Sequence, residues 1–102
     1  WGFGYGNHII LQFEFEDLPR EVQSFMRRES FNERHSAFAL YAHLSRMDVA
    51  EDQEIKVGEV FGVTGNTGFS TNDHLHLEVA YGSSWGNATK YHPSTLFNIL
   101  NK

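Results

Sequence analysis

Apolar and polar residues alternate with a period of two over several segments of the chain, and this pattern predicts β-strands. The clearest segment is Ala37–Ser45, in which one face would carry Phe38, Leu40, Ala42 and Leu44. Further strands are predicted over four segments: His8–Glu16, Glu54–Val57, Val60–Thr64 and His74–Ala80. The pattern therefore favours a mostly β, antiparallel domain.

The apolar spacing changes to that of a helix after Asp17. Over about Leu18–Arg28 we expect a short helix whose apolar face comprises Leu18, Val22, Phe25 and Met26. Asp17 is a candidate cap for this helix, and Pro19 would lie in its first turn. A second short helix is expected over Ser94–Leu100, after Pro93. The predicted fold is a compact antiparallel β-sheet domain with an inserted short helix and a short C-terminal helix.

Composition narrows the classes of partner and of chemistry. The 102 residues suffice for one small domain, and the formal charge of −5, with eight Lys and Arg in no long run, argues against nucleic acid or an anionic membrane as partner. No apolar run is long enough to span a bilayer. The absence of cysteine excludes disulfides, thiolate metal sites and a cysteine nucleophile.

Two histidines lie one residue apart in the predicted strand His74–Ala80. His74, His76 and Glu78 would share one face, opposite the apolar row of Leu75, Leu77 and Val79. Side chains at i and i+2 of a strand are about 6.5 to 7 Å apart, so both imidazoles are able to reach one metal ion. Equally, one imidazole could bind metal while the other transfers a proton, and the spacing leaves both arrangements open.

A third histidine, His43, follows Tyr41 on the polar face of the predicted strand Ala37–Ser45. Taken alone, His43 is interpreted as a polar residue of the strand. Tyr41 on the same face favours a role for His43 in a functional site. No role is assigned to His8, His35 or His92. No G-x-S-x-G motif of a serine hydrolase is present, and the glycine-rich segment Gly65–Asp73 lacks the Lys-Ser/Thr ending of a phosphate-binding loop.

Three stretches together resemble the M23 family of zinc metallopeptidases, of the lysostaphin or LytM type. They are GYGNHIIL (Gly4–Leu11), LYAHLS (Leu40–Ser45) and IKVGEVFGVTGNTGFSTNDHLHLEV (Ile55–Val79), in the order of the family. The resemblance implies a compact antiparallel β fold with a narrow groove and, as substrate, the peptide part of bacterial peptidoglycan. It also implies a bacterial or phage protein that works outside the cytoplasm, in the periplasm, at the cell surface or after secretion.

The resemblance implies roles for the three histidines. His76 would be a ligand of Zn²⁺, and His74 and His43 would be catalytic residues beside the metal. We expect His74 to be the general base and His43 to stabilise the oxyanion, although the reverse division remains open.

The chain departs from the family pattern at its start. The family's other two zinc ligands, in H-x-x-x-D, precede the G-Y-G-N strand, whereas only Trp1, Gly2 and Phe3 precede it here. We therefore expect residues 1–102 to be a single M23/LytM-like domain that lacks its N-terminal segment. The alternative is a degenerate, non-catalytic LytM-like module that activates a cell-wall amidase.

A second departure is the segment Asp17–Ser36, where the family usually has a tight hairpin. We interpret it as an inserted helix. It would narrow access to the groove, dock a protein partner, or be a neutral elaboration. A third departure is Asn72-Asp73, which stands where the family usually has Gly-Pro.

Overall fold

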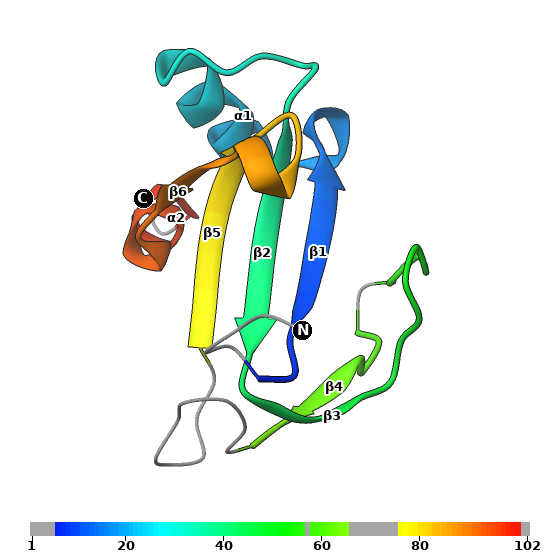
Figure 1. The fold of residues 1–102 in the computed structure, drawn as a ribbon. Coiled ribbons are helices and arrows are strands. Elements are labelled where there is room, and N and C mark those ends of the chain that lie inside the picture. Colours follow the sequence, from blue (N-terminus) through cyan, green and yellow to red (C-terminus); the bar gives the residue numbers. More distant parts are fainter. Residues whose placement is uncertain (1–5, 57, 66–75, 101–102) are drawn as a thin grey trace. The chain divides into compact units, whose positions relative to one another are not determined.

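The computed structural model describes residues 6–56, 58–65 and 76–100 (Figure 1). In chain order the elements are β1 (Ile9–Glu14), the 3-10 helix η1 (Phe15–Asp17), α1 (Arg20–Arg28), β2 (Ser36–Ala42), β3 (Leu44–Met47), β4 (Gly62–Thr64), β5 (His76–Gly82), the 3-10 helix η2 (Trp85–Asn87), β6 (Thr89–Tyr91) and α2 (Pro93–Leu100).

Four strands form one sheet in the order β1-β2-β5-β6, and β3 and β4 form a separate two-stranded sheet. β1 and β2 run in opposite directions (Figure 1). β5 pairs antiparallel with β6, with Val79 opposite Tyr91, and β3 pairs antiparallel with β4, with Leu44 opposite Thr64. The predicted fold class is confirmed, because the chain is mostly β with antiparallel sheets and has a short helix at both expected places.

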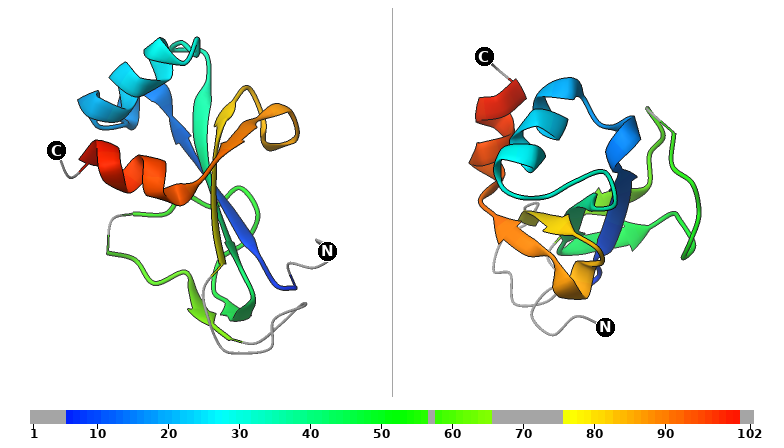
Figure 2. Two further views of the ribbon diagram at one scale, coloured as in Figure 1. Left: turned by 90° about the vertical axis from the view of Figure 1, so that its left-hand side faces the viewer. Right: turned by 90° about the horizontal axis from the view of Figure 1, so that it is seen from above.

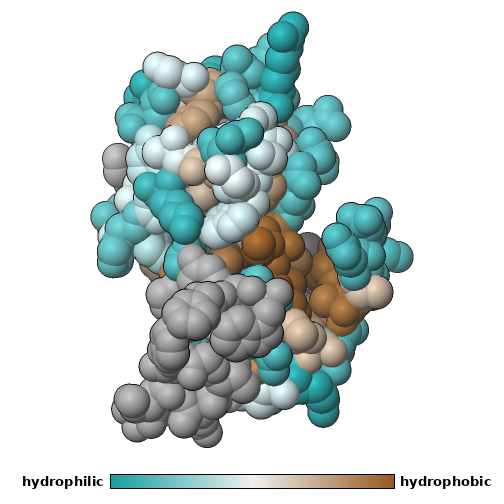
Figure 3. Space-filling view, in the orientation of Figure 1, coloured by the Kyte–Doolittle hydropathy of each residue, from teal (hydrophilic) through white to brown (hydrophobic). Residues whose placement is uncertain are grey.

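The chain divides into two compact units, which are described separately. Residues 10–40 and 77–102 make up the sheet unit, and residues 1–9 and 41–76 make up the β3–β4 unit. In the sheet unit, α1 lies beside α2 (Figure 2). On the face seen in Figure 3, hydrophilic residues predominate over α1 and the loop after it, where the exposed residues include Arg27, Arg28, Glu29, Asn32, Glu33 and Arg34.

The core of the sheet unit contains the predicted apolar residues Val22, Phe25 and Met26 of α1, but β2 contributes Ala37, which lies on the strand face opposite the predicted row that begins at Phe38. Its buried cluster consists of Phe15, Val22, Phe25, Met26, Ala37, Val79, Tyr81 and Ile99. Phe25 of α1 contacts the rings of Tyr81 and Tyr91 at centroid distances of 5.6 and 5.4 Å. These tilted and edge-on contacts add to the burial of apolar area that attaches α1 to the sheet.

The inserted helix begins later than predicted. Leu18 is extended, with φ −84° and ψ 153°, because the residue before a proline is kept out of the helical region. Pro19 is the N-cap residue, and no side chain caps the helix, so the prediction of Asp17 as cap is wrong. Asp17 belongs to η1 instead. In the first turn of α1, the Val22 and Gln23 N–H groups both donate to the Pro19 carbonyl at 3.0 Å.

The strand predicted over Glu54–Val57 is wrong for its described part, residues 54–56. The Lys56 N–H donates to the Glu59 carboxylate at 3.1 Å, and the Glu59 N–H donates to the Lys56 carbonyl at 3.0 Å. These local bonds close a turn, with Gly58 at a φ of 85°, in place of strand pairing. The strand predicted over Val60–Thr64 is confirmed only at its end, as β4 (Gly62–Thr64).

Among the residues that the structure describes, no helix is long and apolar enough to cross a membrane.

Candidate functional site

The three predicted site histidines differ in how much the structure describes of them. His43 lies in the described β3–β4 unit with its side chain. His76 is the first residue of β5, and its backbone alone is described. His74 lies outside the described residues. The roles assigned to these histidines remain predictions.

His43 occupies a break that the sequence pattern did not predict. The predicted strand Ala37–Ser45 ends as β2 at Ala42 and resumes as β3 at Leu44. Between them, His43 has a φ of 59°, in the left-handed region that asparagine, aspartate and histidine tolerate better than most side chains. Its side chain is buried, with 7% of the residue exposed. The chain therefore turns at His43 and leaves the imidazole in a protected position.

The backbone on both sides of His43 is fixed by hydrogen bonds. The Gly65 N–H donates to the His43 carbonyl at 2.9 Å, and the Leu44 N–H donates to the Asn7 carbonyl at 2.9 Å. The Asn7 Nδ2 group donates in turn to the Leu44 carbonyl at 3.0 Å. These partners come from the three stretches that carry the family resemblance. They pre-organise His43, since its left-handed turn is bonded at both of its flanking peptide groups.

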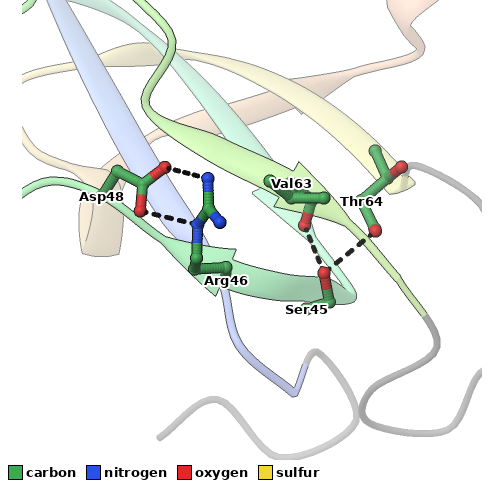
Figure 4. A network of polar contacts seen from close by, with 5 residues as sticks. All are labelled: Ser45, Arg46, Asp48, Val63 and Thr64. Carbon is green, nitrogen blue, oxygen red and sulfur yellow. Dashed lines mark hydrogen bonds and ion pairs between the residues drawn. The ribbon is translucent and has the colours of Figure 1, made fainter.

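Ser45 attaches β3 to the end of β4 (Figure 4). Its Oγ lies 3.1 Å from the Thr64 carbonyl and 3.3 Å from the Val63 carbonyl, so its single proton is shared between the two oxygens. Further along β3, Arg46 makes a two-point contact with Asp48, at 2.9 and 3.1 Å. That pair is exposed and contributes little to stability. Ser45 lies where the register between β3 and β4 shifts, between Leu44 and Arg46, and its two contacts join the strands at that irregularity.

Tyr41, the predicted neighbour of His43 in the motif, packs edge-on against Phe61 at a centroid distance of 5.1 Å. Burial raises the pKa of the Tyr41 hydroxyl above its ordinary value. The phenol is protonated at neutral pH, as an unperturbed tyrosine also is, and can donate a hydrogen bond.

Glu78, the carboxylate that the sequence places beside the two strand histidines, forms an ion pair with Lys90 of β6 at 3.2 Å. The Lys90 ammonium also lies 5.1 Å from the centre of the Trp85 ring. This partner was not predicted from the sequence, because β6, which brings Lys90 opposite Ala80, was not predicted either. Glu78 is thus held by a cation and by its place in the sheet unit.

The other histidines engage local backbone. The His8 Nδ1 donates to the Gly6 carbonyl at 3.1 Å. The His35 Nδ1 accepts from the Asn32 N–H at 3.0 Å, and the His92 Nδ1 accepts from the Ser94 N–H at 3.1 Å. These contacts are those of turn residues, and no role is assigned to the three.

The donor types suit zinc, but the described part of the chain does not assemble a complete set. Imidazoles are typical zinc ligands, and a catalytic zinc takes three protein ligands. Among the side chains that the structure describes, which exclude that of His76, no group of three His, Cys, Asp or Glu is placed to hold a metal ion. The described residues therefore do not by themselves form a catalytic metal site.

Comparison with known proteins identifies the family of this arrangement. The model of peptidase family M23 matches residues 30–91, more than half of the chain. This range contains His43, its Gly65 partner and both histidines of the His74–His76 pair. No solved structure gives a significant match.

Curated relatives fall into two functional groups. Lysostaphin of Staphylococcus simulans is 38% identical over 53 residues, which are 52% of this chain and 10% of that protein. The DD-carboxypeptidase/endopeptidase Mpg of Neisseria meningitidis is 54% identical over 39 residues, 38% of this chain and 9% of that protein. The murein hydrolase activator NlpD of Salmonella typhimurium is 31% identical over 90 residues, 88% of this chain and 18% of that protein. The chain thus spans less than a fifth of the length of these relatives.

Proposed function

Because the chain belongs to peptidase family M23, we propose that it is part of a zinc-dependent endopeptidase that hydrolyses peptide cross-links of bacterial peptidoglycan. The observation that carries the proposal is the buried, left-handed His43, bonded through its backbone to Gly65 and flanked by the bonds between Leu44 and Asn7. A histidine that served only as a polar strand residue would not need a strand break and two fixed peptide groups.

In this proposal His76 is a zinc ligand. Zinc, when bound, polarises the scissile carbonyl and lowers the pKa of its water. His74 accepts the proton of the attacking water and later returns one to the leaving amine. His43 donates a hydrogen bond to the oxyanion that develops on the carbonyl oxygen. The burial of His43 suits this role, because a donor that is already held in place needs little reorganisation during the reaction.

The zinc ligands other than His76 are proposed to come from sequence upstream of residue 1. One imidazole cannot hold a catalytic zinc, and the described residues contain no three-ligand group. We propose that residues 1–102 belong to one M23-type domain. The experiments below therefore use the full-length protein.

The substrate class rests on the names of relatives. A glycyl-glycine endopeptidase of Staphylococcus capitis is 42% identical over 38 residues, 37% of this chain and 10% of that protein. The Neisseria relative is named as an endopeptidase as well. We propose peptidoglycan peptide as the substrate and a location outside the cytoplasm, where that polymer lies.

Zinc content tests the proposed metal site. Elemental analysis of the dialysed full-length protein is expected to find about one zinc per chain, and far less after His76→Ala. His92→Ala is the matched control, because the exposed His92 side chain makes its hydrogen bonds with the nearby Ser94. A protein that binds no zinc, or one that keeps its zinc after His76→Ala, would remove the proposed ligand role.

The second candidate function is activation of a separate murein hydrolase. The match to the activator NlpD covers 88% of this chain, against 52% for lysostaphin. A purified amidase incubated with peptidoglycan, with and without the protein, tests this candidate. Stimulation by the protein, retained after zinc removal and after His43→Asn, favours the activator. Release of peptide fragments without any amidase favours the peptidase.

A further inference from the structure

A groove lies between α1 and α2 in the sheet unit, and none of the described residues that line it is one of the proposed site histidines, His43, His74 and His76. Its volume is about 310 Å³, and the two helices lie side by side (Figure 2). It is lined by Arg20, Glu21, Ser24 and Arg28 from α1 and by Ile99 and Leu100 from α2. The groove therefore has a charged wall and an aliphatic wall.

The charged wall has a regular spacing. Arg20, Ser24 and Arg28 follow one another at intervals of four residues, so they share one face of α1. At a rise of 1.5 Å per residue, the two arginine Cα atoms stand about 12 Å apart along the helix. Two cationic groups thus bracket a hydroxyl over slightly more than two helical turns.

Both arginines are exposed and carry no salt bridge within the described residues. The ion pairs there join Arg46 to Asp48 and Lys90 to Glu78. The Arg28 guanidinium lies 6.0 Å from the centre of the Phe25 ring, a contact that leaves its donors available. The lining carries two arginines against the single Glu21, in a chain with a formal charge of −5. The surface of the groove consequently favours an anionic ligand.

The remaining lining residues indicate which kind of anion fits. Leu100 is 44% exposed and offers apolar surface that a phosphate polymer has no group to cover. Glu21 is an acceptor that repels phosphate but can receive a peptide N–H. A peptide supplies carboxylates, apolar side chains and N–H donors together, so it matches every part of the lining.

We propose that the groove between α1 and α2 binds an acidic peptide segment of a partner protein. In an extended peptide, side chains four residues apart are separated by about 13 Å, close to the spacing of Arg20 and Arg28. Glutamates at these two positions pair with the arginines, and apolar residues between them contact Leu100. The insertion Asp17–Ser36 supplies the charged wall, which gives it the role of docking a partner. This inference does not depend on the proposed hydrolysis, because binding is measured without cleavage.

The test uses a fluorescein-labelled peptide with the core Glu-Leu-Ala-Leu-Glu and a matched peptide with glutamine in place of both glutamates. Binding to the full-length protein is measured by fluorescence anisotropy. We expect saturable binding of the glutamate peptide alone, weakened as salt rises from about 50 to about 300 mM. The double change Arg20→Gln and Arg28→Gln is expected to raise Kd about tenfold or more.

Matched variants separate the groove from general charge attraction. Arg27→Gln removes one positive charge from α1, as Arg20→Gln or Arg28→Gln does alone, but Arg27 lies over the Phe15 ring and does not line the groove. It should change Kd less than about twofold. Leu100→Ser should weaken binding, whereas Phe97→Ser, at a residue that is 51% exposed and does not line the groove, should not.

Three outcomes would overturn the inference. In the first, Arg27→Gln weakens binding of the glutamate peptide as much as Arg20→Gln or Arg28→Gln alone. In the second, the glutamine peptide binds as tightly as the glutamate peptide. In the third, inorganic polyphosphate binds more tightly than the peptide, and Leu100→Ser does not change its Kd. The last outcome would identify the groove as a site for an anionic polymer instead. Circular dichroism of each variant verifies that a loss of binding is not a loss of fold.

Discussion

Gly65 lies so close to Ser45 that a Cβ atom built on the glycine would stand 2.4 Å from the Ser45 Cβ and 2.9 Å from its backbone nitrogen. No side chain fits there without moving β3 away from the Gly65 backbone. The same glycine donates its N–H to the His43 carbonyl. The close approach of these two residues therefore fixes the turn that carries His43.

Gly65→Ala is expected to lower the free energy of unfolding by about 1 to 3 kcal/mol, because the added methyl group meets the backbone and Cβ of Ser45. Urea denaturation measures this change. Gly86→Ala is the control, since a Cβ at Gly86 meets nothing within 4 Å. Equal effects of the two substitutions would contradict the close approach.

Asn7→Asp is expected to lower the free energy of unfolding by about 1 kcal/mol or more, because the side chain loses the N–H that it donates to the Leu44 carbonyl. Thermal unfolding measures the change. Asn87→Asp makes the same charge change at an exposed residue of η2 and should be close to neutral. If the two variants unfold alike, Asn7 does not hold the backbone beside His43.

His43→Asn is expected to preserve the fold, since asparagine tolerates a φ of 59°. If His43 stabilises the oxyanion, kcat for peptidoglycan cleavage should fall about 10²- to 10³-fold with little change in KM. His92→Asn should leave both parameters unchanged. A His43→Asn protein that keeps kcat within about twofold would assign the oxyanion contact to another group.

Tyr81 makes stability sensitive to alkaline pH. Burial, with a smaller contribution from Tyr91, raises the pKa of the Tyr81 hydroxyl to about 12. Because the folded pKa lies above the unfolded value near 10, this contribution is intact below about pH 10 and is lost as pH rises toward 12. Unfolding measured across this range should show a decline that is smaller in Tyr81→Phe.

The same substitution has a second expected effect. The Tyr81 hydroxyl is buried and has no hydrogen-bond partner among the described residues. Removing it should leave the free energy of unfolding at pH 7 unchanged or raise it by up to about 1 kcal/mol. A marked loss of stability in Tyr81→Phe would mean that the hydroxyl is satisfied.

Alternation predicted the buried face of the segment Ala37–Ser45, because the burial of apolar side chains on one strand face produces the alternation. Phe38, Leu40, Ala42 and Leu44 are all buried as expected. Because the alternation continues from Ala37 to Ser45, it did not predict the break between β2 and β3 at His43. A single left-handed residue turns the chain yet returns Leu44 to the interior, so the pattern of polar and apolar positions continues through the turn.

The other differences come from local hydrogen bonds and backbone restrictions. The helix could not begin at Leu18, because Pro19 keeps the preceding residue out of the helical region. This restriction can be read from the sequence. The turn at Lys56–Glu59 depends on a hydrogen bond from the Lys56 backbone N–H to the Glu59 carboxylate, which a count of apolar positions does not detect. The ion pair between Glu78 and Lys90 follows from the pairing of β5 with β6, and the residues around either one do not predict it.

The most direct test of the proposed function is the release of peptide fragments from purified peptidoglycan by the full-length protein, identified by mass spectrometry. The account predicts new amino and carboxyl termini in the cross-link peptides. Their formation should stop when a chelator removes the metal and should return when zinc is added back. Intact cross-links in the presence of zinc, with a properly folded protein, would contradict the endopeptidase assignment.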